Sequence, residues 1–118
     1  MIETSDVSFS KKYKYYVYLL YSYKDGGFYI GFTEDLKVRL ISHAKGKNSA
    51  TKDRRPLKLL HYEYFINKAD AKAREEFLKS GYGRKQLKQI LKRTLSTFDT
   101  KSSILSLSKP PQRWNHID

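Results

Sequence analysis

The fold of this chain is decided by residues 13–32, which read YKYYVYLLYSYKDGGFYIGF. Tyrosine, valine and leucine crowd residues 13–23, and these residue types favour a pleated, half-buried strand. The sequence KDGG at residues 24–27 supplies turn chemistry, and residues 28–32 read as the returning strand. The segment therefore predicts a β-hairpin.

A helix and a third strand are expected after the hairpin. Thr33 can cap a helix that carries Glu34 and Asp35 in its first turn and ends at Gly46. Its apolar residues recur at helical spacing and predict one buried stripe, made of Leu36, Leu40, Ile41 and Ala44. Pro56 ends any helical pattern, and residues 57–66 read as a strand.

The chain from residue 67 onward is predicted to be helical. A helix is expected from Asn67 to Gly81, with a buried side made of Ala69, Ala73 and Phe77. After a break at residues 81–83, a last helix begins at Arg84, with inward residues Leu87, Ile90, Leu91 and Leu95. This order of elements predicts an α/β fold of the α+β type, a small three-stranded antiparallel sheet flanked by helices.

The length of 118 residues suits one domain with one hydrophobic core. Residues 1–12 show little periodicity and are expected to form a flexible leader or a short added strand. The folded domain is expected at residues 13–95. Residues 96–118, rich in Ser, Thr, Lys and Pro, are expected to form a flexible tail that contains Trp114.

Composition excludes several classes of protein. No apolar run approaches the roughly 18 residues of a membrane span, and residues 1–12 do not read as a signal peptide. A soluble, cytoplasmic protein is expected. The chain has no cysteine, which excludes disulfides and thiolate zinc sites, and its three histidines are scattered. Any metal ion would therefore be held mainly by oxygen.

The charge balance indicates a polyanionic partner. Twenty-four Lys and Arg against twelve Asp and Glu give a net charge of +12. Nucleic acid is the commonest partner of a small basic domain, since each neutralised phosphate releases counterions; general solubility is the alternative explanation. The expected phosphate contacts are Lys45, Lys47, Lys52, Arg54 and Arg55 in one loop and Lys85, Lys88 and Lys92 along the last helix.

The order and spacing of several residues resemble the GIY-YIG nuclease family. Tyr16-Val17-Tyr18 stands where the family has its first tripeptide, and Tyr29-Ile30-Gly31 is the second tripeptide. Arg39 and His43 follow on the first expected helix, and Arg74-Glu75-x-x-Leu78-Lys79 resembles the glutamate motif of the family. The nearest likeness is to small stand-alone bacterial members related to the N-terminal nuclease domain of the excinuclease.

This resemblance implies a metal-dependent DNA endonuclease that hydrolyses phosphodiester bonds, in DNA repair or recombination. It implies that Glu75 anchors Mg²⁺ or Mn²⁺ and that Arg39 grips phosphate oxygens. Tyr18 and Tyr29 would deprotonate or merely orient the attacking water, and the sequence leaves both roles open. His43 would bond a phosphate or relay a proton.

Each of these residues also has a structural explanation. Glu75 could pair with Lys79 on a solvated helix, Arg39 could be a surface cation, and His43 could be a buried structural residue. The sequence departs from the family pattern at Phe32, where some excinuclease-type members carry a lysine.

Two rival functions are compatible with the same sequence. The first is a non-catalytic nucleic-acid-binding module on the same fold, and RNA is as compatible with its charge as DNA. The second is a domain that grips an acidic protein, for which no specific residue speaks.

Overall fold

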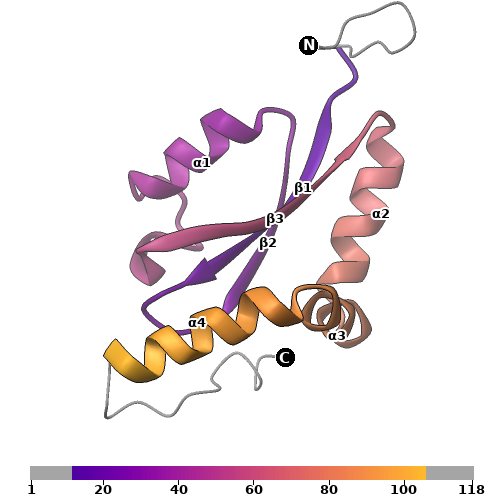
Figure 1. Ribbon diagram of the computed structural model, residues 1–118. Helices are drawn as coiled ribbons and strands as arrows, with labels where there is room; N and C mark the ends of the chain where they lie inside the picture. The colour runs from indigo at the N-terminus through magenta and orange to yellow at the C-terminus, as the bar shows by residue number, and fades with distance from the viewer. Residues whose placement is uncertain (1–11, 106–118) are drawn as a thin grey trace, which may run out of the picture.

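A three-stranded antiparallel sheet lies at the centre of the computed structural model, which describes residues 12–105 (Figure 1). β1 (Tyr15–Ser22) is the central strand, with β2 (Phe28–Thr33) on one side and β3 (Leu57–Phe65) on the other. The expected hairpin and third strand are confirmed, as is the α+β class.

The turn of the hairpin is closed by hydrogen bonds between its ends. Ser22 N–H donates to the carbonyl of Gly27 at 2.9 Å, and Gly26 N–H donates to the carbonyl of Ser22 at 2.8 Å. Gly26 has a φ of 72°, in the left-handed region that glycine adopts without steric cost. The KDGG segment thus forms the turn that its composition predicted.

In the described part of the chain, four α-helices and one short 3₁₀ helix surround the sheet. α1 (Leu36–Ala44) follows β2, and η1 (Lys52–Arg54) precedes β3. α2 (Lys68–Leu78), α3 (Gly81–Ile90) and α4 (Lys92–Leu105) follow β3 in succession. Figure 1 shows α1 and α2 on opposite sides of the sheet.

Alternation along β1 separates the two faces of the sheet. Val17, Leu19 and Tyr21 belong to the main core, together with Leu78 of α2 and Leu87 of α3. The residues between them in sequence point to the opposite face, which α1 covers. One face of the sheet is therefore an apolar core, whereas the other holds polar aromatic residues.

α1 begins at a different cap from the one expected. Asp35 is the N-cap, and its carboxylate accepts a hydrogen bond from the N–H of Val38 at 3.1 Å. Thr33 instead forms a turn before the cap, where its Oγ1 accepts from the N–H of Asp35 at 3.1 Å. The prediction of Thr33 as the cap is wrong, because Asp35 stands where the free N–H groups of the helix begin.

The buried side of α1 is also not the expected apolar stripe. Ile41 is 44% exposed and Ala44 is exposed, while Leu36 and Leu40 are only half-buried. The one fully buried side chain of α1 is His43. Hydrogen bonds of His43 to Tyr18 of the sheet and to Thr51 before η1, rather than apolar periodicity, accompany the burial of this side of α1.

α2 is capped by Asn67 as expected, but a different side of it is buried. Ala71 and Leu78 are the buried residues, and Arg74 and Glu75 lie between them on the same side of the helix. The residues expected to be buried are exposed: Ala69, Ala73 and Phe77. Apolar spacing was misleading here because charged residues occupy part of the contact side.

The last predicted helix is two helices. Ser80 caps α3, so this helix begins at Gly81 rather than at Arg84. It ends with a cap at Leu91, after which α4 begins. The inward residues are partly as expected: Leu87 and Leu95 are buried and Leu91 is half-buried, but Ile90 is 54% exposed.

The expected domain ends fall partly outside the described residues. α4 continues to Leu105, so residues 96–105 are helical where a flexible tail was predicted to begin. The leader, apart from Lys12, and the rest of the tail, including Trp114, lie outside residues 12–105. Within those described residues, no helix is both long and apolar enough to span a bilayer.

Candidate active site

Tyr18 lies at the centre of the sheet face that α1 covers. The residue is 1% exposed, and its Oη lies 2.8 Å from Nε2 of His43. β1 presents Tyr18 on this face by simple alternation, whereas α1 presents His43 one turn after Arg39. β1 precedes β2 in the chain and α1 follows it, and this hydrogen bond joins the two elements.

Both ring nitrogens of His43 have a partner. Nδ1 lies 2.7 Å from Oγ1 of Thr51, a residue with no exposed surface, and Nε2 faces Tyr18. A neutral imidazole donates through one nitrogen and accepts through the other, so the three side chains form one continuous hydrogen-bonded chain. Burial and the charge of Arg39 lower the pKa of His43, which keeps the ring neutral at neutral pH.

The pKa of Tyr18 bears on the two roles expected for it. Burial raises the pKa of this phenol well above its usual value, and Tyr29 adds to the rise. The charge of Arg39 and a hydrogen bond to it act in the opposite direction without reversing the shift. Tyr18 therefore stays protonated at neutral pH, which favours orientation by hydrogen bonding over action as a free phenolate.

Tyr29 and Arg39 complete a cluster of four predicted residues on this face. The Tyr29 ring centroid lies 6.2 Å from that of Tyr18 and 5.2 Å from that of His43. Arg39 is near enough to influence the pKa of both Tyr18 and His43. Tyr29 is half-buried, so it is open to solvent while Tyr18 is not.

Gly31 makes room for the Tyr18 ring. It is the cross-strand partner of Tyr18 in the β1–β2 pair. A Cβ at Gly31 would overlap Cζ and Oη of Tyr18 and lie 2.8 Å from its Cε1. The glycine of the second tripeptide thus permits the phenol to lie flat across β2.

Glu75 lies on α2 and therefore on the other side of the sheet. Its carboxylate is paired with Lys72 Nζ at 3.1 Å and Lys79 Nζ at 3.0 Å, and its side chain is 13% exposed. Burial works to raise the pKa of this carboxyl, but hydrogen bonds and charges from the two lysines outweigh it and hold the pKa below its usual value. Glu75 is thus an ionised carboxylate at neutral pH.

Lys72 connects Glu75 to the edge strand. Its Nζ lies 4.6 Å from the ring centroid of Phe32 on β2, one residue after Gly31. The ammonium group of Lys72 therefore lies over Phe32, the position at which some family members carry a lysine. Glu75 and its two lysines are accordingly close to the β2 edge of the sheet.

A divalent cation at Glu75 would depend on this one carboxylate. Among residues 12–105, no group of three or more His, Cys, Asp or Glu is arranged to hold a metal ion. An ionised, partly accessible carboxylate still suits Mg²⁺ or Mn²⁺, which retain water and take further oxygens from a phosphate substrate. Because both oxygens are paired, a cation would have to displace Lys72 or Lys79.

The eight expected phosphate contacts do not form one surface. The loop residues lie on or beside the C-terminal part of α1, on the Tyr18 side of the sheet. Lys85 and Lys88 lie on α3, whose Leu87 packs into the core on the opposite face, and Lys92 begins α4. Among residues 12–105, six of the expected ammonium groups make no ion pair or hydrogen bond: Lys45, Lys47, Lys52, Lys85, Lys88 and Lys92.

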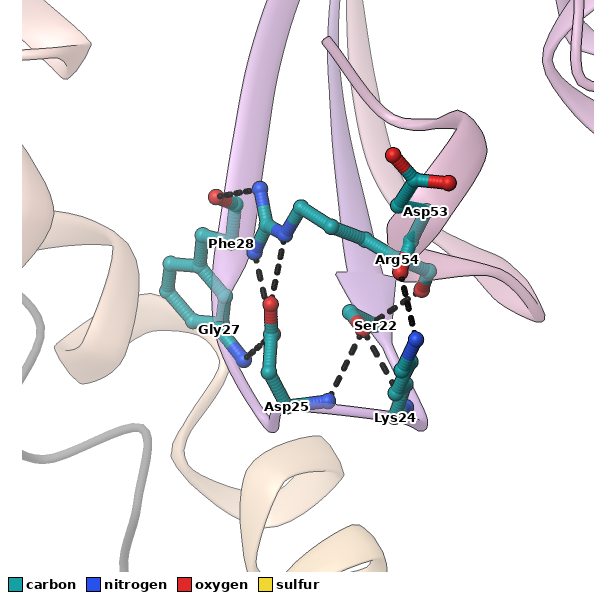
Figure 2. A network of polar contacts seen from close by, with 7 residues as sticks. All are labelled: Ser22, Lys24, Asp25, Gly27, Phe28, Asp53 and Arg54. Carbon is teal, nitrogen blue, oxygen red and sulfur yellow. Dashed lines mark hydrogen bonds and ion pairs between the residues drawn. The ribbon is translucent and has the colours of Figure 1, made fainter.

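The two loop arginines are occupied by structural contacts. Figure 2 shows the Arg54 guanidinium between the Asp25 carboxylate and the carbonyl of Phe28, with Nε 2.6 Å from Oδ2 of Asp25. Arg55 donates to the carbonyl of Lys52 at 2.9 Å and of Ala44 at 3.3 Å. Arg54 clamps the hairpin turn and Arg55 ties the loop to α1, so both guanidinium groups already have partners, and phosphate contact by either stays a prediction.

The profile of the GIY-YIG catalytic domain matches residues 14–89. The chain belongs to the GIY-YIG family. The matched range contains both tripeptides and the four-residue cluster on the α1 side, as well as Glu75 on α2. GIY-YIG proteins are a family of nucleases that act on DNA.

Small bacterial GIY-YIG relatives match most of their own length. A UPF0213 protein of Staphylococcus saprophyticus is 38% identical over 65% of this chain and 94% of its own. A UPF0213 protein of Limosilactobacillus reuteri is 40% identical over 66% of this chain and 83% of its own. The solution NMR structure of a UPF0213 protein from Bacillus halodurans is 35% identical, with a TM-score of 0.44, over 65% of this chain and 84% of that one.

Two residues of this GIY-YIG site carry no signal in the sequence. Thr51 holds His43 from a loop in which only the basic residues attract attention. Lys72 reaches Phe32 from an apparently ordinary helix surface. Each acts through a contact with a residue of another element, which no motif within one helix or strand reveals.

Proposed function

We propose that this chain is a metal-dependent GIY-YIG endonuclease that hydrolyses phosphodiester bonds of DNA in repair or recombination. The observation that carries the proposal is the hydrogen-bonded pair of Tyr18 and His43 beside Arg39 on one face of the sheet. A neutral imidazole, a permanent cation and a fixed phenol can orient the reacting groups and stabilise the charge that develops in phosphodiester hydrolysis.

Arg39 binds the scissile phosphate in this proposal. Its planar guanidinium stays charged at any relevant pH and donates two hydrogen bonds to the non-bridging oxygens, where negative charge builds in the transition state. The unpaired ammonium groups of Lys45, Lys47 and Lys52 bind neighbouring phosphates on the same side of the sheet.

The attacking water is oriented by Tyr29, which is open to solvent. As its oxygen bonds to phosphorus, the bond to the departing sugar oxygen breaks. The proton of the water leaves to solvent on the open side of Tyr29, while the buried Tyr18 stays protonated and donates its Oη–H to Nε2 of the neutral His43. Thr51 accepts from Nδ1–H and so fixes the neutral ring of His43, while the sugar oxygen takes a proton from solvent.

Glu75 holds the cation when Mg²⁺ or Mn²⁺ is bound, with Lys72 or Lys79 displaced from its carboxylate. A bound divalent ion supplies Lewis-acid stabilisation of the phosphate oxygens and the leaving oxygen. A displaced lysine remains near the edge of β2, where its charge can meet the same phosphate.

Glu75→Gln tests the proposal, since it keeps the shape of the side chain and removes its charge. The adjacent Glu76→Gln is the matched control, because Glu76 is exposed on the same helix. Purified proteins are incubated with supercoiled, branched and flapped DNA with Mg²⁺ or Mn²⁺, and with chelator. We expect the cutting rate of Glu75→Gln to fall by roughly 10²-fold or more, and that of Glu76→Gln to stay within about twofold.

Cutting that survives both chelation and Glu75→Gln would refute metal-dependent hydrolysis at this carboxylate. Binding of Mn²⁺ to the protein without DNA is measured by the paramagnetic broadening of NMR signals near Glu75. A folded Glu75→Gln protein without this broadening has lost the metal ligand and not the fold. This readout does not depend on knowing the preferred DNA structure.

A non-catalytic nucleic-acid-binding module is the second candidate. The observation in its favour is that both oxygens of Glu75 are already paired with lysines. It predicts salt-sensitive binding, with a log–log slope of several units, and no product with any metal. Nicks at stoichiometric protein that vanish on chelation would decide against it.

A further inference from the structure

A cavity of about 630 Å³ lies between α1 and the sheet, on the side of His43 away from the β2 edge. Its walls come from α1, β1, β3 and η1 with the residues that follow it. The size is within the range of sites for small organic molecules. It exists because α1 does not bury its apolar residues against the sheet as their spacing predicted.

The two long walls of the cavity are apolar. Leu40 lines it from α1, and Leu20, Leu57 and Leu59 line it from the strands. Leu40, Leu57 and Leu59 are only half-buried, so apolar surface remains open within the space between helix and sheet. Because leucines line the cavity both from the helix and from the strands, an apolar ring bound between them would remove apolar surface from water.

The remaining lining of the cavity is mainly cationic. Lys24, Lys52 and Arg55 contribute to it, against the single carboxylate of Asp53 among the lining residues described. Arg55 and Lys24 are held in place by backbone carbonyls, whereas Lys52 has no side-chain partner in residues 12–105. An anionic group attached to a flat ring therefore finds positive charge at the same site.

We propose that this cavity binds a nucleoside monophosphate unit, with the base between the leucine walls and the phosphate near Lys52. A flat, weakly polar ring joined to an anion matches the two kinds of lining, whereas inorganic phosphate would use only the lysines. The unit is either a free mononucleotide or one nucleotide of a DNA strand turned out of its stack. The proposal concerns binding and does not require the chain to cut DNA.

Ala44→Trp tests the cavity directly. Ala44 is exposed at the end of α1 and lines the cavity, so an indole can cover the space without disturbing the core. Ala73→Trp, on the exposed side of α2, is the matched control. Each protein is titrated with deoxyadenosine monophosphate, ribose 5-phosphate and inorganic phosphate, and amide shifts are followed by NMR.

In the wild type and in Ala73→Trp, we expect deoxyadenosine monophosphate to shift the amides of Leu20, Leu40 and Leu59. Affinity for it should exceed that for ribose 5-phosphate by roughly tenfold or more, because the base removes apolar surface of itself and of the leucines from water. Ala44→Trp should lose that preference, and Lys52→Ala should weaken binding of all three probes. Equal affinity for nucleotide and inorganic phosphate, or unchanged nucleotide binding by Ala44→Trp, would overturn the proposal.

The source of the nucleotide is decided with oligonucleotides. If the unit belongs to a DNA strand, Ala44→Trp weakens binding of a single-stranded oligonucleotide relative to Ala73→Trp, and abasic residues weaken it in the wild type. If the unit is a free mononucleotide, Ala44→Trp loses mononucleotide binding. In that case neither Ala44→Trp nor the abasic residues change the affinity for the oligonucleotide. Neither outcome depends on nuclease activity, so failure of the proposed hydrolysis and failure of this proposal are seen separately.

Discussion

Gly31→Ala is the substitution that most directly tests the packing of the candidate site. The added Cβ would overlap Cζ and Oη of Tyr18 and lie 2.8 Å from Cε1. An ordinary contact between carbon atoms needs about 3.5 Å, so the ring must move by roughly 0.7 Å or more. The ring cannot move freely, because Tyr18 is 1% exposed and its Oη is bonded to His43 Nε2 at 2.8 Å.

The expected cost follows from this conflict. Overpacking a filled interior typically costs about 1–3 kcal/mol, and lengthening of the Tyr18–His43 hydrogen bond adds to it. For a domain of this size, 1 kcal/mol corresponds to roughly 4–8 °C in Tm, so Gly31→Ala should lower Tm by about 4–24 °C. Activity should fall with it, since the displaced phenol no longer lies between Arg39 and His43.

Gly81→Ala is the matched control for this experiment. A Cβ at Gly81 meets nothing within 4 Å, and this residue begins α3. Its backbone has no positive φ, so alanine should be neutral or stabilise the fold by up to about 1 kcal/mol. Thermal unfolding followed by circular dichroism measures both. A Gly31→Ala protein with the wild-type Tm and cutting rate would refute the assigned position of Tyr18.

Three further results are expected. Tyr18→Phe leaves His43 Nε2 without its partner and should cost about 1–3 kcal/mol in urea unfolding as well as most of the cutting rate; an unchanged rate would remove the phenol from the mechanism. The pKa of His43 is lowered in the folded protein, so around pH 6.5, the usual pKa of about 6.5 for histidine, the unfolded chain binds more protons than the folded one. The free energy of unfolding should therefore fall as the pH is lowered from about 7.5 to 5.5. A stability that does not change over this range contradicts a neutral, buried ring. Arg54→Ala removes the guanidinium that pairs with Asp25 and should lower stability by about 1–2 kcal/mol after allowance for partial exposure, whereas Lys47→Ala should stay within about 0.5 kcal/mol in the same assay.

The hairpin could be predicted from sequence because its determinants are local. Strand-forming residues, the KDGG turn and the returning strand are contiguous, and the pairing of Tyr18 with Gly31 follows from the turn. The strand at Leu57–Phe65 was equally evident from its composition. Each of these elements needs no information about a distant part of the chain.

The helix faces could not be predicted because distant contacts decide them. His43 is buried on α1 since Tyr18 and Thr51, neither of them on α1, offer partners for its two nitrogens. Arg74 lies on the contact side of α2 because Glu63 of β3 accepts from it, with Nε 2.7 Å from Oε1. Apolar periodicity assumes that contact surfaces are apolar, and both helices contradict that assumption.

The position of Glu75 imposes a constraint on how DNA can bind. The sheet separates α2 from the face that holds Tyr18, so a phosphate cannot reach both groups through the body of the sheet. β2 is the edge strand, and Lys72 places the Glu75 cluster beside it over the ring of Phe32.

A phosphate that meets Arg39 on one side and a cation at Glu75 on the other must therefore lie along the outer edge of β2, next to Gly31. A large side chain introduced on that edge should block cutting even where the four-residue cluster on the α1 side and the Glu75 cluster stay intact. The edge strand, rather than either helix, is the element across which the two halves of the proposed chemistry can act on one bond.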